Sequence, residues 1–348
     1  MTTNSHLEQA PVSLRKAAEI IPLLMQGNVV PFLHGSPAVG KSSVVHDLAK
    51  KFNLELIDVR LSQLDPTDLM GFPTFDSAKV KYKPVEMFPI VGDPIPEGKK
   101  GWLVFLDEAN GASHAVQMSA YKLILDRMVG NHKLHPNVKM VAAGNLETDG
   151  AIVNSMSSAL ISRFAHIKVK LDKKEWLDWA TASGIDYRIT SFLSFKKDLL
   201  YTFNPDATDP YASPRTWEMV SKVIKNLGAV DGKHKDLIAS MIGEGCAREF
   251  ITYIKLYQEI PTFDQIMKDP EGITISENLG TQWAVMSMVC TEVDDKTSKQ
   301  AETFLTRLGM ELQVCAMREL LNRKGKQFLV TGMQSWFAKT AKEIYRAE

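Results

Sequence analysis

The chain has 348 residues, of which 45% are apolar and 24% charged, the composition of a folded chain with about two domains. Its 41 basic and 41 acidic side chains cancel, so no bulk field attracts the protein to nucleic acid or to an anionic membrane. The chain starts without a signal-peptide pattern, has no apolar run of membrane-spanning length and carries three widely spaced cysteines. These features exclude a secreted disulfide scaffold and a membrane-inserted protein, and they predict a cytoplasmic protein.

In the first half of the chain, segments typical of strands alternate with segments typical of helices, which indicates a parallel sheet covered by helices. Pro31 has no N–H to give to a central ladder, so we expect it at the first position of its strand. The predicted elements in chain order are a helix at 14–26, a strand at 32–34, a helix at 44–52, strands at 54–61 and 102–106, a helix at 113–128, and strands at 138–143 and 165–169.

Two regions depart from this alternation. Between residues 62 and 100 six prolines exclude a long helix, and apolar segments at 72–75 and 80–82 flank Asp76–Lys79, which predicts a hairpin. After about residue 171 strand signals fade and helical periodicity takes over. Apolar residues there step by three and four as one predicted helix stripe, namely Ala301, Phe304, Leu308, Leu312 and Cys315.

A phosphate-binding loop is predicted at residues 35–42, whose letters match G-x-x-x-x-G-K-S. The motif follows a predicted strand and opens a predicted helix, which is the context that gives it meaning. Its backbone N–H groups can surround phosphate oxygens, Lys41 can reach the β- and γ-phosphates of ATP, and the Ser42 hydroxyl can bind Mg²⁺. The predicted nucleotide-binding residues are Gly35, Ser36, Pro37, Ala38, Val39, Gly40, Lys41, Ser42 and Ser43.

Two further strands end in polar side chains. The apolar strand at 102–106 leads into Asp107 and Glu108, and a parallel strand delivers its end to the same sheet edge as the phosphate loop. Asp107 can bind Mg²⁺ together with Ser42, and Glu108 can orient or deprotonate the attacking water. The strand at 138–143 leads into Asn145, whose neutral amide can position that water without repelling the γ-phosphate.

Together these residues resemble the AAA+ ATPases, and within them the MoxR-like branch, over roughly residues 14–220. The resemblance implies that Arg163 reaches into the ATP site of the neighbouring subunit and that Arg215 contacts the γ-phosphate from the lid of its own subunit. The segments that carry it, besides the two nucleotide motifs, are Leu64–Gly71 with the hairpin (the branch's insert), Ala143–Asn145 (sensor 1), Ala159–Phe164 (the arginine finger) and Ser213–Thr216 (sensor 2).

The implied fold class is α/β. A P-loop AAA+ core at 1–171 would contain a five-stranded parallel sheet flanked by helices and an insert at 62–100. An all-helical lid at 172–262 and a helical C-terminal extension at 263–348 would follow. One departure is that the family usually places a basic residue shortly after the acid pair, whereas Ala109–Gly111 lacks it; Arg127 is the candidate replacement.

The implied function is Mg²⁺-dependent ATP hydrolysis by a homo-oligomeric ring, of six subunits in this family, that remodels or activates a protein partner in the manner of a chaperone. Such partners often carry a von Willebrand factor A domain. Two alternatives stay open. A nucleic-acid motor or loader is suggested by Lys79, Lys81 and Lys83 in the hairpin region. A non-hydrolysing nucleotide switch would not need Glu108, Asn145 or Arg163.

Overall fold

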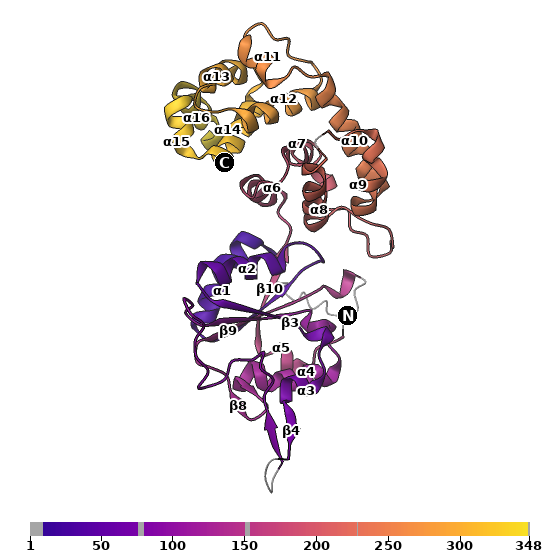
Figure 1. The fold of residues 1–348 in the computed structure, drawn as a ribbon, viewed down its shortest axis with the longest axis vertical. Coiled ribbons are helices and arrows are strands. Elements are labelled where there is room, and N and C mark those ends of the chain that lie inside the picture. Colours follow the sequence, from indigo (N-terminus) through magenta and orange to yellow (C-terminus); the bar gives the residue numbers. More distant parts are fainter. Residues whose placement is uncertain (1–9, 76–79, 150–153, 228, 347–348) are drawn as a thin grey trace, which may run out of the picture. The chain divides into compact units, whose positions relative to one another are not determined.

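The computed structural model describes residues 10–75, 80–149, 154–227 and 229–346. The chain folds into two compact units, unit 1 (Met1–Asp172) and unit 2 (Lys173–Glu348) (Figure 1). Within the described ranges, none of the helices combines the length and the apolar character that crossing a membrane requires. The three cysteines, Cys246, Cys290 and Cys315, are free thiols.

Unit 1 is built on a parallel sheet of six described strands in the order β1-β10-β2-β9-β6-β3. Five of them are the predicted ones, and the sixth, β1, is a two-residue edge strand that pairs with β10, too short to leave a pattern in the sequence. Pro31 is the second residue of β2 rather than the first, and the ladder with β9 begins one residue later, at Phe32. The strands are β1 Val12–Ser13, β2 Val30–His34, β3 Glu55–Arg60, β6 Trp102–Asp107, β9 Val138–Gly144 and β10 Phe164–Lys170.

Helices cover both faces of this sheet (Figure 1). In the central strand β6, Val104 and Leu106 join the core formed with α3 and α4, and alternation turns Leu103 and Phe105 to the opposite face, where α1 and α2 lie. Because both faces are buried, β6 is apolar throughout, as a central parallel strand requires. The helices of unit 1 are α1 Leu14–Gln26, α2 Lys41–Lys51, α3 Pro66–Met70, α4 His114–Tyr121 and α5 Ser158–Ile161.

The predicted helix at 113–128 is confirmed up to Asp126, but its second half is wound as a π-helix and it ends two residues earlier than predicted. Ser113 caps α4, which ends at Tyr121, and a π-helical turn at Lys122–Asp126 follows before the chain becomes extended at Met128. Apolar spacing cannot reveal this change because Leu123 and Ile124 stay buried in either winding. Short 3₁₀ turns lie at Leu61–Gln63, Ala109–Gly111 and Glu147–Asp149.

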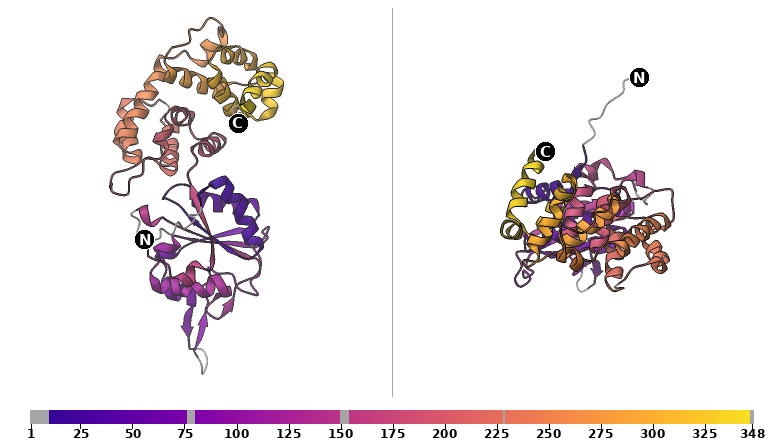
Figure 2. Two further views of the ribbon diagram at one scale, coloured as in Figure 1. Left: turned by 180° about the vertical axis from the view of Figure 1, so that it is seen from behind. Right: turned by 90° about the horizontal axis from the view of Figure 1, so that it is seen from above.

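The predicted hairpin is present as the antiparallel strands β4 (Phe72–Thr74) and β5 (Lys81–Lys83), and the predicted turn at Asp76–Lys79 lies outside the described residues. The two strands project from the body of unit 1 (Figure 2). A second antiparallel pair, β7 (Met128–Val129) and β8 (His132–Lys133), contacts their base through the His132 ring, whose Nε2 lies 2.9 Å from the carbonyl oxygen of Tyr82.

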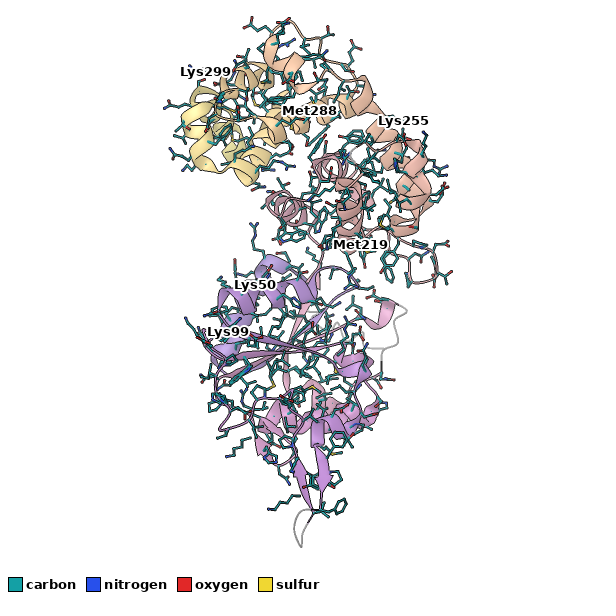
Figure 3. The ribbon with its side chains drawn as sticks, in the orientation of Figure 1. Lys50, Lys99, Met219, Lys255, Met288 and Lys299 are labelled. Atoms are coloured by element: carbon teal, nitrogen blue, oxygen red, sulfur yellow. The ribbon has the colours of Figure 1, made fainter. Side chains whose placement is uncertain are left out.

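Unit 2 is helical, as predicted. Its central helix, α12, is buried nearly all round and packs against α7, α10 and α14; Met288 lies on it (Figure 3). The helices and 3₁₀ turns are α6 Lys173–Ala182, α7 Tyr187–Phe195, η5 Lys197–Leu200, α8 Pro214–Lys225, η6 Gly232–His234, α9 Lys235–Ile242, α10 Glu244–Glu259, α11 Phe263–Lys268, α12 Leu279–Glu292, α13 Ser298–Thr306, α14 Met310–Lys324, α15 Lys326–Gly332 and α16 Gln334–Arg346.

The apolar stripe predicted on one helix is divided between two. Ala301 and Phe304 belong to α13, whereas Leu312 and Cys315 belong to α14, and Gly309 caps the second helix after a break. The stripe residues are buried except for Cys315, which is half-buried, so the apolar spacing identifies most of the core residues but not the break between the helices.

Candidate nucleotide site

The parallel strands bring the predicted polar residues of the first unit to one edge of the sheet. Neighbouring strands β3, β6, β9 and β2 all run in the same direction, so their carboxyl ends share that edge. Asp107 ends β6, Asn145 follows β9, and Gly35 follows β2. Ligands of open parallel sheets bind outside such carboxyl ends.

The phosphate loop runs from Gly35 to the start of α2 at Lys41. Gly35 N–H donates to the carbonyl oxygen of Gly144 (3.3 Å), which fixes the loop to the end of β9. Ala38 and Gly40 both have left-handed backbone conformations, with φ of +59° and +108°. This local curl brings the chain round to the N-terminus of an 11-residue helix, where free N–H groups and the helix dipole favour an anion.

Lys41 connects the loop to the predicted sensor. Its side chain is buried, and Nζ donates to the carbonyl oxygens of Gly35 (2.5 Å) and Ser36 (3.0 Å) and to Oδ1 of Asn145 (3.1 Å). The ammonium group thus lies between the end of β2 and the end of β9. At this position the ammonium group can bind the negatively charged phosphate oxygens of a nucleotide.

Ser42 and Asp107 form a pair of oxygen donors beside that lysine. Ser42 Oγ donates to Asp107 Oδ2 at 3.2 Å. Burial raises the pKa of the Asp107 carboxyl, and the N–H of Glu108 and the Ser42 hydroxyl counteract this rise. A hydroxyl and a carboxylate suit Mg²⁺, which prefers oxygen ligands and is usually completed by water and phosphate. Among the described residues, no group of three His, Cys, Asp or Glu side chains is placed so that it could hold a metal ion.

Glu108 follows Asp107 in a left-handed conformation (φ +53°) that is uncommon for a residue with a side chain. Its carboxylate accepts a hydrogen bond from the Ser62 hydroxyl. The sequence interpretation missed Ser62. The available signal was its position two residues after β3, the strand that pairs with β6.

Asn110 is a second residue that the interpretation missed. Its buried side chain accepts from the N–H of Asn145 (3.2 Å) and donates to the carbonyl oxygen of the same residue (2.8 Å). A Cβ at Gly144 would collide with the Asn110 amide, so a glycine is required at that position. Asn110 thereby fixes the backbone from which the Asn145 side chain extends towards Lys41.

A half-buried pair of histidines lies next to the loop. His34 is the last residue of β2, and its Nε2 lies 2.6 Å from Nδ1 of His166 on β10; Nε2 of His166 lies 2.8 Å from the carbonyl oxygen of Ile161. Because that carbonyl accepts, Nε2 of His166 carries the proton and Nδ1 receives the hydrogen bond from His34. Burial first, and then the neighbouring His166, lower the pKa of His34 to about 4, so the His34 ring is neutral at neutral pH.

Arg163 lies away from this edge. It immediately precedes β10, and Phe164 pairs with Val30 at the beginning of β2, whereas Lys168 pairs with His34 at the end. The four-residue offset between these pairs, together with the step back to Arg163, amounts to roughly 16 Å of strand. Arg163 is therefore at the amino edge of the sheet, opposite the phosphate loop of its own chain.

Arg127 is at the same amino edge. Its guanidinium donates to the carbonyl oxygen of Val138, the first residue of β9. The suggestion that Arg127 replaces the basic residue missing after the acid pair therefore gains no support from the geometry, because this side chain stabilises the start of a strand instead.

Arg215 belongs to unit 2, where it is the second residue of α8. Ser213 caps that helix, Pro214 occupies its first position, and Thr216 completes a reciprocal capping box. This local sequence defines the helix start sharply, and the Arg215 side chain is exposed.

Residues 31–164 match the family described as AAA domain (dynein-related subfamily). This range lies within unit 1 and makes up less than half of the chain, so the match shows what unit 1 is similar to. The matched range begins in β2 and ends at the start of β10, so it includes the phosphate loop, the acid pair and Asn145. The resemblance to AAA+ ATPases predicted from the motifs is thereby confirmed at the level of the domain.

Among known proteins, the chain is similar to Midasin of Giardia intestinalis, with 25% identity over 178 residues. That match covers 49% of this chain but only 4% of Midasin. Solved structures similar to this chain include NtrX from Brucella abortus in complex with ATP, with a TM-score of 0.41 and 13% identity over 98% of this chain and 68% of NtrX. Another is a putative ATPase from Cytophaga hutchinsonii, with a TM-score of 0.38 and 14% identity; the match covers 95% of this chain and 90% of that one.

Proposed function

We propose that this chain is an AAA+ ATPase that hydrolyses ATP with Mg²⁺, works as a ring of six copies, and remodels or activates a protein partner in the manner of the MoxR-like branch. The observation that carries the proposal is the convergence of Lys41, Asp107, Glu108 and Asn145 at one edge of the sheet. The direct test is ATP turnover by the purified protein with and without Mg²⁺. A protein that binds ATP without turning it over would instead be a nucleotide switch.

Each residue at this edge has a role in the proposed reaction. The loop N–H groups and Lys41 bind the phosphates, and Ser42 and Asp107 would hold Mg²⁺, which would neutralise charge on the phosphate oxygens. Glu108 orients the attacking water and accepts its proton, after leaving its hydrogen bond with Ser62. Asn145 holds the same water from β9, in the orientation that Asn110 gives it.

The proposed ring follows from the position of Arg163. A guanidinium at the amino edge is too far from its own phosphate loop to stabilise charge on the γ-phosphate there. It can do so for a neighbouring copy, and a hydrolase in which each site needs an arginine from the next subunit must be a closed ring or a filament. Unit 2 would supply Arg215 from a lid at 172–262, with 263–348 as a further helical extension.

Replacing Lys41 by alanine should weaken ATP binding roughly 10- to 100-fold, because one charge-assisted hydrogen bond to phosphate is worth about 1.5–3 kcal/mol. Direct titration with a fluorescent ATP analogue measures the affinity. The matched control is Lys50→Ala, at the exposed outer end of the same helix (Figure 3). Equal ATP affinities for the two variants would contradict the assignment of Lys41 to phosphate binding, provided that thermal melting shows both variants to be folded.

The β4–β5 hairpin is proposed to contact the partner protein or the central pore of the ring. Phe75 is 78% exposed and Tyr82 45% exposed, which a hairpin stabilised only by aromatic packing would not require. Lys81 and Lys83 alternate with Tyr82 along β5, so basic and aromatic side chains occupy opposite faces of the hairpin.

Replacing Phe75 and Tyr82 together by alanine should abolish partner-stimulated turnover while basal ATPase activity and the melting temperature stay within about twofold and a few degrees of wild type. A fall in basal activity or in stability would show that the two rings pack within the domain instead. The matched pair Lys81→Ala and Lys83→Ala tests the nucleic-acid alternative, since salt-dependent DNA binding lost in this variant would favour a nucleic-acid motor.

A further inference from the structure

Tyr121 and Arg163 are in contact at the surface of unit 1. The guanidinium carbon of Arg163 lies 5.0 Å from the centre of the Tyr121 ring, a cation–π geometry. Nη1 of Arg163 donates to the carbonyl oxygen of Ala159 within α5. The Tyr121 hydroxyl is hydrogen-bonded to Ser157, the residue that caps α5. Tyr121 thus contacts both the guanidinium of Arg163 and the start of α5, the short helix that precedes Arg163.

This arrangement restrains Arg163 without neutralising it. Within the described residues no carboxylate pairs with the guanidinium, and its Nε is buried without a hydrogen-bond partner. An arginine stacked on a ring keeps N–H groups along the edge of its plane for a further acceptor. A π-helical turn begins directly after Tyr121, at the point where α4 ends, and such turns are frequent at functional sites.

We propose that Tyr121 is a positioning residue for Arg163. It holds the guanidinium in the orientation in which Arg163 meets the phosphates bound by the neighbouring subunit. The inference rests on the in-trans role given to Arg163 above and adds the residue that prepares it for that role. An arginine side chain has many rotamers, and a transition-state charge is stabilised best by a group that is already oriented when the charge develops.

Replacing Tyr121 by leucine keeps an apolar side chain but removes the ring. We expect kcat to fall roughly 3- to 10-fold with little change in KM. A loss of this size corresponds to one cation–π contact that stabilises the transition state. Tyr121→Phe, which keeps the ring and loses only the hydrogen bond to Ser157, should retain most of the activity. Ser119→Ala, on the same helix, whose hydroxyl bonds to the Ala115 carbonyl, should match wild type.

A subunit-mixing experiment separates positioning from a general structural role. When Tyr121→Leu subunits are diluted into excess Glu108→Gln subunits, each intact Glu108 faces a neighbour with intact Tyr121 and Arg163. Turnover per added Tyr121→Leu subunit should then equal that of wild-type subunits diluted in the same way. Dilution into excess Arg163→Ala subunits should leave turnover at the reduced value, because no site gains a properly held arginine.

Persistence of the deficit in excess Glu108→Gln subunits would overturn the proposal, because Tyr121 would then act in its own subunit's site. If Arg163→Ala and Glu108→Gln subunits fail to complement each other, the in-trans role of Arg163 is wrong, and the Tyr121 proposal is decided by the double variant instead. Tyr121→Leu combined with Arg163→Ala should then lose no more activity than Arg163→Ala alone, and multiplied losses would overturn it.

Discussion

Replacing Glu108 by glutamine should lower ATP turnover by about 100-fold or more while leaving ATP binding intact. Glutamine has nearly the same shape but cannot accept the proton of the attacking water. The Ser62 hydroxyl that now donates to the carboxylate can donate to the amide oxygen equally well, so the local structure should persist. Steady-state phosphate release measures turnover, and titration of the nucleotide measures binding.

The matched control for this substitution is Glu97→Gln, which makes the same chemical change at an exposed position of the same unit. Wild-type turnover is expected for it. Turnover by Glu108→Gln within a few-fold of wild type would show that another group activates the water.

Replacing Arg163 by alanine should lower turnover by about 10³-fold, the scale on which arginine fingers contribute in nucleotide hydrolases. The expected cause is loss of positive charge at the γ-phosphate bound by the neighbouring copy. ATP affinity and the oligomeric state should change much less, which titration and light scattering check. Arg248→Ala, an exposed arginine on α10, provides the control for loss of one surface charge. A tenfold or smaller effect would argue against a finger.

The motif residues could be predicted from the sequence because each motif lies at or directly after the end of a strand. Apolar runs locate the parallel strands, and parallel pairing then brings Gly35, Asp107 and Asn145 to one edge without any knowledge of side-chain packing. The amino-edge position of Arg163 follows from the same rule, since this residue precedes a strand instead of following one.

The supporting residues could not be predicted, because their contacts join segments far apart in the chain. Asn110 holds the backbone of a residue 35 positions away, Ser62 reaches Glu108 over 46 positions, and the Tyr121 hydroxyl reaches Ser157 over 36. Asparagine, serine and tyrosine at such positions have many ordinary uses, so only the folded arrangement distinguishes them. Changes of helix type, such as the π-helical turn after Tyr121, could not be predicted either, because they leave the apolar spacing nearly unchanged.

The central claim, that each ATP site is completed by Arg163 of the next subunit, is tested most directly by mixing Arg163→Ala and Glu108→Gln proteins under conditions in which subunits exchange. Each protein alone is expected to be nearly inactive. In a mixed ring, some sites combine an intact Glu108 with an intact Arg163 from the neighbour, so turnover should return to a substantial fraction of wild type. If labelled subunits demonstrate exchange and turnover stays at the level of the separate variants, the shared site and the ring proposed from it are contradicted.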